Sequence, residues 1–276
     1  MIKLEDVSFR YKEDKYVLKN INLEINKGSC IAIVGKNGSG KSTLAKLISG
    51  IAKPSKGEIL VDEINTRNKK EYINLRKKVG IVFQNPENQI IFNNVKDELS
   101  FALTNLNLDD KELRIEQSLK KVKLSLSEDS EIDELSLGQK QRIAIASVLA
   151  VNPEYIVFDE PTTMIDSDGK DAVYNIISEL KRSGYTIIYI TNNTEEILLA
   201  DKIIVLNDGE IATQINKKEL LEKIELLKKF NIKIPTVIST LDKLKNSGIN
   251  IELEDYTMEE LTKKIIDNIK HNEGIN

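Results

Sequence analysis

The sequence has little of the side-chain chemistry on which metal clusters and covalent sites depend. Its 276 residues include one cysteine, Cys30, and one histidine, His271. A single cysteine excludes an intrachain disulfide, a zinc ribbon and an iron–sulfur cluster. One histidine leaves no material for a histidine-rich metal site and little for a catalytic triad. Because a lone free thiol is at home in a reducing compartment, we expect a cytoplasmic protein.

Long hydrophobic runs are also missing. The apolar runs, such as residues 31–34, 156–158 and 187–190, are short, whereas roughly 20 residues are needed to span a bilayer. Residues 1–6 already alternate apolar and charged side chains like a strand, so we expect no signal peptide. If the protein works at a membrane, something other than a spanning helix of its own must hold it there.

The charge is mixed and nearly balanced. The chain has 40 basic and 44 acidic residues, a formal net charge of -4. This slightly acidic balance argues against a primary nucleic-acid binder. The length, with 40% hydrophobic residues, fits one large α/β domain carrying a small extension.

Segments with strand character alternate with segments of helical spacing, which predicts a mainly parallel core sheet. A block of helices interrupts the strands: Leu99, Ala102, Leu103 and Leu106 share one predicted face, and Leu113, Ile115, Leu119 and Val122 share another. Strands are predicted at residues 3–9, 17–25, 30–34, 58–61, 79–83, 155–158, 186–190 and 202–206. Helices are predicted at about 41–51, between 95 and 122, at 136–149 and at 167–181.

The composition shifts after Gly209. We expect one domain over residues 1–212, with a helical subdomain inserted at about 88–150, and an extension over 213–276. The extension is rich in Lys, Glu, Leu and Ile, with breaks at Pro235 and Gly248, and its pattern predicts helix, helix, short strand and helix. It is too small and too charged for a catalytic domain, so we expect a role in oligomerisation or regulation.

The sharpest motif lies at residues 35–42, Gly-Lys-Asn-Gly-Ser-Gly-Lys-Ser. It matches G-x-x-x-x-G-K-[ST], follows a buried strand and opens a helix, which is the context of a phosphate-binding loop (P-loop) rather than of a plain glycine-rich turn. Such a loop wraps its backbone amides around phosphates at a helix N-terminus. Lys41 is predicted to reach the β- and γ-phosphates of ATP, and Ser42 to ligate Mg²⁺. The other predicted nucleotide-binding residues are Gly35, Lys36, Asn37, Gly38, Ser39, Gly40 and Thr43.

A second motif supplies acidic partners. The hydrophobic run 155–158 ends in Asp159 and Glu160, which places both carboxylates at the edge of the sheet where α/β proteins bind ligands. Asp159 is predicted to hold Mg²⁺ through water, and Glu160 to act as general base on the attacking water. The alternative, a strand that merely ends in acidic surface residues, is weakened by the P-loop.

The third motif narrows the class. Residues 135–142, Leu-Ser-Leu-Gly-Gln-Lys-Gln-Arg, resemble the LSGGQ signature of ABC-type ATPases, and the resemblance covers about residues 1–210. It implies a P-loop NTPase core with an antiparallel β subdomain and an inserted helical subdomain. It also implies that Ser136, Gly138 and Gln139 contact ATP bound to an opposite subunit in a head-to-tail dimer. Leu137 departs from the family's first glycine, whereas Gly138 is kept.

Further positions match this family. Tyr11 resembles the aromatic that stacks on adenine, although it could be a plain strand-edge tyrosine. Gln84 resembles the glutamine that touches Mg²⁺ and links the core to the helical subdomain. Asp166 stands where the family has its D-loop aspartate, although the residues before it are atypical.

One position breaks the family pattern. The family usually carries a histidine that hydrogen-bonds the γ-phosphate, and here Asn192 occupies this switch position. An asparagine amide can donate a hydrogen bond but carries no positive charge. We therefore predict that this site binds ATP well and hydrolyses it slowly. The alternative is that Asn192 does the work adequately.

Two features point to a group within the family. Residues 83–92, Phe-Gln-Asn-Pro-Glu-Asn-Gln-Ile-Ile-Phe, resemble a segment of energy-coupling factor (ECF) transporter ATPases, including the cobalt-type subunits, and the extension resembles theirs. The resemblance implies uptake of a vitamin or transition-metal ion at the cytoplasmic face of the cell membrane. It implies a second ABC ATPase subunit, identical or paralogous, a membrane-embedded coupling subunit and a substrate-binding membrane subunit. Ile90, Ile91 and Phe92 then have a docking interpretation, the alternative being subdomain core.

Two other functions stay open. One is a soluble, non-transport ABC ATPase acting on DNA or ribosomes, which the acidic balance, the single cassette and the short spacing from P-loop to signature all disfavour. The other is a nucleotide-gated subunit with little turnover of its own, paired with an active paralogue. Asn192 favours this second possibility, and Glu160 argues against complete inactivity.

Overall fold

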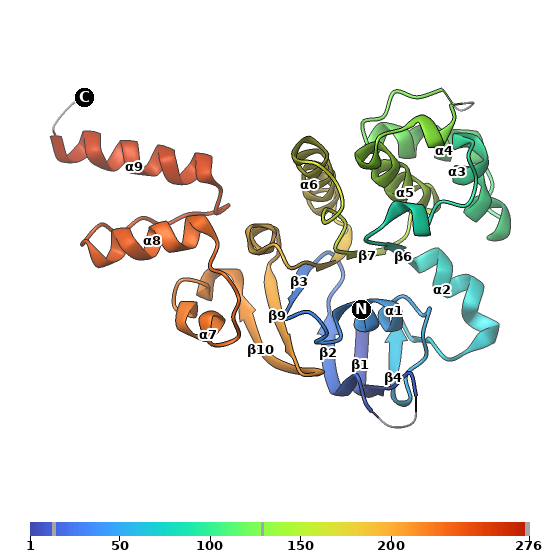
Figure 1. Cartoon of the computed structure of the whole chain (residues 1–276), viewed down its shortest axis with the longest axis horizontal. Helices are drawn as coiled ribbons and strands as arrows, with labels where there is room; N and C mark the ends of the chain where they lie inside the picture. Colours follow the sequence, from blue (N-terminus) through green and yellow to red (C-terminus); the bar gives the residue numbers. More distant parts are fainter. Residues whose placement is uncertain (13–14, 128–129, 274–276) are drawn as a thin grey trace.

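The computed structural model describes residues 1–12, 15–127 and 130–273 (Figure 1). Residues 13–14, 128–129 and 274–276, which fall within the predicted domains, lie outside it. The strands are β1 (Ile2–Phe9), β2 (Leu18–Ile25), β3 (Cys30–Val34), β4 (Lys56–Val61), β5 (Ile64–Asn65), β6 (Val79–Val82), β7 (Tyr155–Asp159), β8 (Thr186–Ile190), β9 (Lys202–Asn207) and β10 (Glu210–Asn216). The α-helices are α1 (Lys41–Ile48), α2 (Tyr72–Lys78), α3 (Val95–Asn105), α4 (Lys111–Lys121), α5 (Leu137–Val151), α6 (Ser167–Arg182), α7 (Ile224–Lys229), α8 (Thr236–Asn246) and α9 (Met258–Glu273).

The strands form two sheets. The larger has the order β10-β9-β3-β8-β7-β6 and is parallel except for β10, which runs antiparallel to β9. The smaller is antiparallel, with the order β2-β1-β4-β5. The predicted α/β core with an antiparallel β subdomain and an inserted helical subdomain is confirmed.

The inner strands of the larger sheet are buried because both faces of the sheet are covered. In β3, Cys30, Ala32 and Val34 join an apolar cluster with α6 and the helical subdomain. Ile31 and Ile33 join a second cluster with α1 and the smaller sheet. Successive side chains of a strand point to opposite faces, so a continuous apolar run suits a strand that is covered on both sides.

Helices α3, α4 and α5 form the inserted subdomain (Figure 1). Leu99 and Leu103 of α3 and Leu106 at its C-cap are buried, as their spacing predicts, and Ala102 is half-buried. The predicted face of α4 needs a correction, because Leu113 is 52% exposed while Ile115 is buried. Residues separated by two positions in a helix point in directions about 200° apart, so Leu113 and Ile115 cannot share a face.

The end of the larger sheet was not predicted. After β9 the chain turns at Asp208 and Gly209, both with positive φ, and β10 pairs with β9 as far as Asn216. An antiparallel edge strand needs only such a tight turn. Because β10 belongs to the core sheet, we propose that the extension begins after Asn216 rather than at residue 213.

After β10, every regular element in the described part of the extension is a helix. The predicted short strand beyond Gly248 is wrong, since no described residue after β10 lies in a strand. Val237 and Leu241 of α8 and Leu261 of α9 are buried and continue the larger apolar cluster. Helices α8 and α9 project to one side of the two sheets (Figure 1).

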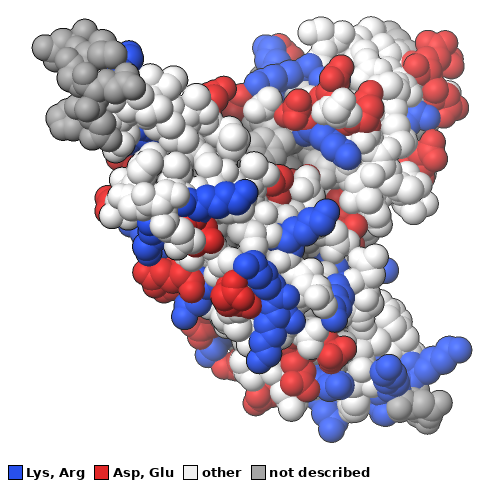
Figure 2. Space-filling model, turned by 60° about the vertical axis from the view of Figure 1, so that its left-hand side comes forward, with Lys and Arg blue, Asp and Glu red and all other residues white. Residues whose placement is uncertain are grey.

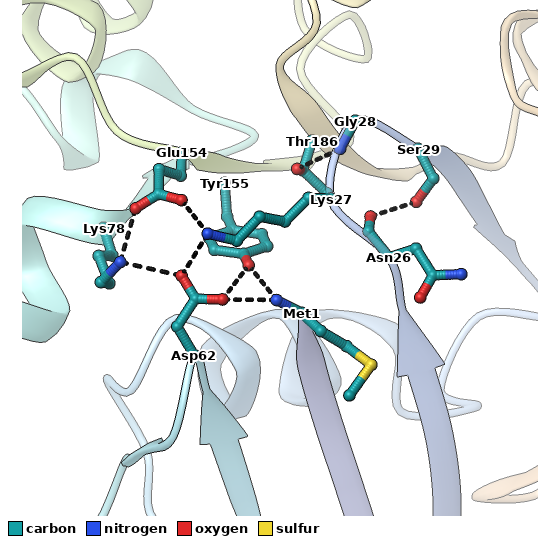
Figure 3. A network of polar contacts seen from close by, with 10 residues as sticks. All are labelled: Met1, Asn26, Lys27, Gly28, Ser29, Asp62, Lys78, Glu154, Tyr155 and Thr186. Atoms are coloured by element: carbon teal, nitrogen blue, oxygen red, sulfur yellow. Dashed lines mark hydrogen bonds and ion pairs between the residues drawn. The ribbon is translucent and has the colours of Figure 1, made fainter.

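Charged side chains gather at the amino ends of the parallel strands (Figure 3). Asp62, in the turn between β4 and β5, is hydrogen-bonded or ion-paired to four groups at 2.5–2.9 Å, two of which are the lysines Lys27 and Lys78. Glu154 pairs with the same two lysines. Burial alone would raise the pKa of Asp62, but hydrogen bonds from these donors hold it well below its usual range. The donors are Met1, Lys78, Tyr155 and Lys27.

The surface carries both signs of charge. Figure 2 shows basic and acidic side chains interspersed over the face in view. Among the described residues, no helix is both long and apolar enough to cross a bilayer.

Candidate functional site

The P-loop residues and four other predicted site residues come together at the carboxyl ends of the parallel strands, whereas Tyr11 and the signature residues lie on or next to other elements. The P-loop joins β3 to α1, Asp159 ends β7 and Glu160 follows it. Gln84 comes shortly after β6, and Asn192 shortly after β8. Ligands of open α/β sheets bind at this edge, because the loops there are free to surround them.

The P-loop is shaped for phosphate. Lys41 is only 5% exposed, and its Nζ donates to the carbonyls of Gly35 and Lys36 at 2.9 and 3.2 Å. Burial lowers the pKa of Lys41. The Ser39 hydroxyl is buried with no hydrogen-bond partner among the described residues. Since an unpaired buried hydroxyl is costly, a phosphate oxygen in the loop would satisfy it.

The loop also needs its first glycine. Gly35 has a φ of +155°, and a Cβ built on it would lie 2.1 Å from the carbonyl oxygen of Leu206 at the end of β9. Any side chain there would push the P-loop away from the sheet.

The residues beside the loop fit a magnesium ion held together with the phosphates. The Ser42 hydroxyl donates to Asp159 Oδ1 at 3.0 Å, and Asp159 is 6% exposed. Burial raises the pKa of Asp159, and the hydrogen bond from Ser42 partly opposes this. A bound divalent cation would remove that penalty, and hydroxyl, carboxylate and amide oxygens are the ligands that Mg²⁺ prefers.

Glu160 is held by three side chains. Its carboxylate accepts from Asn192 Nδ2 at 2.6 Å, from the Thr163 hydroxyl at 3.3 Å and from Gln84 Nε2 at 3.5 Å. Its φ of 51° lies in the left-handed region, and its backbone N–H donates to the carbonyl of Ile190 at 2.9 Å. Such backbone strain in a non-glycine residue is typical of functional sites. Burial raises the pKa of Glu160, as suits a general base.

Asn192 bridges two parts of the site. Its Nδ2 donates to Glu160 and also to Asn37 Oδ1 of the P-loop, at 3.0 Å. The amide nitrogen carries two hydrogens, so both are used within the chain. The motifs predict neither this link to Asn37 nor the bond from Thr163. Only the closeness of Thr163 to Glu160 in sequence hints at the latter.

The signature sits at an exposed helix N-terminus. Ser136 caps α5, its hydroxyl accepting from the N–H of Gln139 at 3.2 Å, while Gln139 Oε1 accepts from the N–H of Ser136 at 2.9 Å. A Cβ on Gly138 would lie 3.3 Å from the Cα of Gly169, so this glycine lets α5 and α6 approach closely. Asp166 caps α6 by accepting from the N–H of Gly169 at 3.0 Å.

Tyr11 lies beside the helix that follows the P-loop. Its hydroxyl is 3.1 Å from the Thr43 hydroxyl, and Phe9 meets its ring edge-on with centroids 4.8 Å apart. The side chain is 60% exposed, which leaves a ring face open for a planar ligand.

Comparison with known proteins decides the family. The model of the ABC transporter family matches residues 18–163, more than half of the chain, and this span holds the P-loop, the signature, Asp159 and Glu160. The chain belongs to the ABC transporter family.

The relatives narrow the group. The energy-coupling factor transporter ATP-binding protein EcfA1 of Fusobacterium nucleatum is 43% identical over 98% of this chain and 100% of its own length. The corresponding EcfA protein of Methanothermobacter thermautotrophicus is 37% identical, over 96% of this chain and 86% of its own. The chain is therefore an ATP-binding subunit of the ECF group and an ABC ATPase that couples hydrolysis to transport.

Solved structures agree. Clostridium perfringens cbiO1, described as part of the transporter complex cbiONQ, superposes with a TM-score of 0.73 at 34% identity, over 87% of this chain and 98% of its own. A dimeric ATP-binding cassette in a post-hydrolysis state, bound to ADP and Pi, superposes with a TM-score of 0.71 at 32% identity, over 79% and 99%.

Proposed function

We propose that this chain is the ATP-hydrolysing motor of an ECF-type importer, bound peripherally to the cytoplasmic face of the cell membrane. The cargo is a vitamin or a transition-metal ion chosen by a substrate-binding membrane subunit. The observation that carries the proposal is the convergence of the P-loop with Asp159, Glu160, Gln84 and Asn192 at one sheet edge.

Each residue has a role in this mechanism. Lys41 and the loop amides bind the phosphates of ATP. Ser42, Gln84 and, through water, Asp159 would hold Mg²⁺, which neutralises charge on the phosphates when bound. Glu160 takes a proton from the attacking water, and its raised pKa suits this task.

A second ATPase subunit completes the site. Ser136 is exposed at the N-terminus of α5, where backbone amides and the helix dipole favour an anion. In a head-to-tail dimer, Ser136, Gly138 and Gln139 face the ATP of the partner. The dimeric form of the structural neighbour bound to ADP and Pi supports this arrangement.

Asn192 makes this chain's own site slow. A neutral amide gives the γ-phosphate no positive charge, and both of its hydrogens are already engaged with Glu160 and Asn37. The chain therefore fits a heterodimer in which an active paralogue supplies most of the turnover. A nucleotide-gated subunit with little turnover of its own is the second candidate, favoured by the same contacts. If the chain alone hydrolyses ATP as fast as its mixture with the paralogue, both ideas fail.

An apolar groove offers a dock for the membrane-embedded coupling subunit. The groove encloses about 490 Å³ between α2, β6 and α3, with Ile73, Ile91 and Phe101 on its lining. These three side chains are 41–64% exposed. Exposed apolar side chains around a concave surface mark interaction sites. Ile91 thus joins the groove, whereas Ile90 packs against the apolar core.

Assembly tests the transport proposal directly. We expect Phe101→Asp to abolish co-purification with the coupling subunit while ATP binding stays intact, because a buried unpaired carboxylate is costly at an apolar interface. Leu113→Asp is the matched control, since Leu113 is 52% exposed on α4 and does not line the groove. Equal loss in both variants, or no loss in either, contradicts the proposed dock. Failure of the unaltered chain to enter any membrane complex contradicts the transport function and favours a soluble ABC ATPase.

A further inference from the structure

A buried carboxylate outside the nucleotide site joins the two loops that carry its reactive groups. Glu196, in the 3-10 helix η4 (Thr194–Leu199), is only 4% exposed. Its Oε1 accepts from the Thr162 hydroxyl at 2.6 Å, and its Oε2 accepts from the Thr191 hydroxyl. Thr162 follows Glu160 by two residues, and Thr191 directly precedes Asn192.

The two threonines belong to different loops. Thr162 lies after β7 and Thr191 after β8, and both are buried. The 2.6 Å bond between Glu160 and Asn192 needs these loops to hold one relative position. Glu196 links the loops by a separate route on their buried side. A carboxylate that bonds one hydroxyl with each oxygen fixes both distances at once.

The segment that carries Glu196 is anchored in the apolar core. Ile197, Leu198 and Leu199, which follow it in η4, are all buried in the larger apolar cluster. Asn193 caps the segment by accepting from the N–H of Glu195 at 3.2 Å. A displacement of Glu196 would therefore require the core packing of η4 to change.

A purely structural role explains Glu196 poorly. Burying a carboxylate is unfavourable, and replacing a buried ionic group by apolar residues of similar size is often neutral or stabilising. The charge gives short, directional hydrogen bonds to the two hydroxyls, and these are stronger than bonds between neutral groups. The geometry favours placement of the loops over general stability.

We infer that Glu196 is a positioning residue that holds the loops of Glu160 and Asn192 in register through Thr162 and Thr191. Its carboxylate bonds the two threonines, so it acts on Glu160 and Asn192 through their loops. This inference rests on the proposed role of Glu160 as general base. It predicts that loss of either hydroxyl slows the chemical step without weakening ATP binding, because small displacements of a base reduce the rate strongly.

The test is single-turnover hydrolysis of radiolabelled ATP by the full-length chain, with enzyme in excess, which measures even a slow rate constant. Glu196→Ala leaves a cavity and can unfold the chain, so Thr162→Val and Thr191→Val carry the test. We expect each to lower the rate constant by roughly ten- to a hundredfold, with the Kd for ATP within about twofold of wild type. Thr162→Ser and Thr191→Ser, which keep the hydroxyl, should restore most of the rate.

Thr186→Val is the matched control. Thr186 is buried at the start of β8, at the opposite end from Thr191, and its hydroxyl accepts from the N–H of Gly28 at 2.9 Å. This variant loses a buried hydrogen bond of similar kind but should keep the rate within about twofold.

Three outcomes overturn the inference. The first is that Thr162→Val and Thr191→Val both keep the wild-type rate constant. The second is that Thr186→Val slows hydrolysis as much as they do. The third is that the serine variants hydrolyse ATP as slowly as the valine variants. Glu160→Gln, measured in parallel, separates this from failure of the proposed function. If Glu160→Gln abolishes hydrolysis and the valine variants do not slow it, only the role of Glu196 is wrong. If Glu160→Gln hydrolyses ATP normally, the proposed base is wrong and the inference falls with it.

Discussion

The acidic side chains at the two ends of the parallel sheet have opposite pKa shifts. At the amino ends, Asp62 and Glu154 are neutralised by cations of the same chain, and their pKa values are lowered (Figure 3). At the carboxyl ends, Asp159 and Glu160 are held mainly by neutral donors, and burial raises their pKa values. One strand, β7, connects Glu154 at its start with Glu160 just past its end.

The difference separates folding from binding. Charges that satisfy one another stabilise the chain alone and need no ligand. Carboxylates that are hydrogen-bonded mainly by neutral donors, a buried lysine and a strained Glu160 are unfavourable by themselves, and a nucleotide with its metal ion would relieve them. The charges at the amino ends are thus satisfied within the chain, whereas the groups at the carboxyl ends are arranged for a ligand.

The largest effect on ATP turnover is expected when the glutamates that flank β7 are each replaced by glutamine. Glu160→Gln removes the proposed base and should lower ATP turnover by about 10²- to 10⁴-fold while ATP still binds. Glu154→Gln, the matched control, should keep turnover within about twofold. Steady-state turnover and ATP affinity check this, and comparable losses of turnover in both variants would show that the two ends are not distinct.

Replacing the two aspartates should affect the free energy of unfolding differently in the absence of nucleotide. Asp62→Asn should lower the free energy of unfolding by about 1–3 kcal/mol, because it breaks hydrogen bonds to charged groups. Asp159→Asn should leave it unchanged or higher, because a neutral amide avoids the burial that raises the Asp159 pKa. Denaturant unfolding of the ligand-free chain measures both. A loss for Asp159→Asn as large as that for Asp62→Asn would break the comparison.

The effect of Asp62 should also depend on pH. Its pKa is depressed in the folded state, so its contribution is fully present above the unfolded value of about 3.9. That contribution disappears as the pH falls from there toward the folded pKa. The difference in unfolding free energy between wild type and Asp62→Asn should therefore shrink as the pH falls below about 4. A difference that stays constant over this range would contradict the assignment.

Adding a group that can carry positive charge at the carboxyl ends of the strands should raise ATP turnover. Asn192→His offers the γ-phosphate a donor that can carry positive charge, and we expect turnover to rise roughly tenfold, or about 1.4 kcal/mol of barrier. The double variant with Glu160→Gln should stay inactive, which shows that the gain acts through the same site. If wild type is already fast and histidine adds nothing, Asn192 is a working substitute and a homodimeric motor is the simpler account.

The smallest effect is expected at the solvent-exposed edge of the charged network. Lys27 pairs with Asp62 and Glu154, but its side chain is 54% exposed, and Lys78 pairs with the same two acids. Lys27→Met should destabilise the chain less than Asp62→Asn, because water and Lys78 replace the lost ion pair. Thermal unfolding at low ionic strength checks the order, and the reverse order would place the centre of the network on Lys27.

The sequence predicted the core well where the signal was local. The P-loop, the acid-ending strand and the buried apolar runs each follow from a few consecutive residues, and their elements form as expected. The errors came from choices that local sequence leaves open. Leu113 lies on the exposed side of α4, β10 extends the core sheet beyond the predicted strands, and the described part of the chain after β10 contains no strand.

Short runs of residues specify which groups the site contains, because a phosphate loop, a strand ending in carboxylates and a helix-capping signature are each local patterns. The way these groups meet depends on the folding of the whole chain. Asn192 reaches both Asn37 and Glu160, and Glu196 ties Thr162 to Thr191, across residues that are far apart in the chain. Such contacts depend on the order of strands in the sheet, which no single segment specifies.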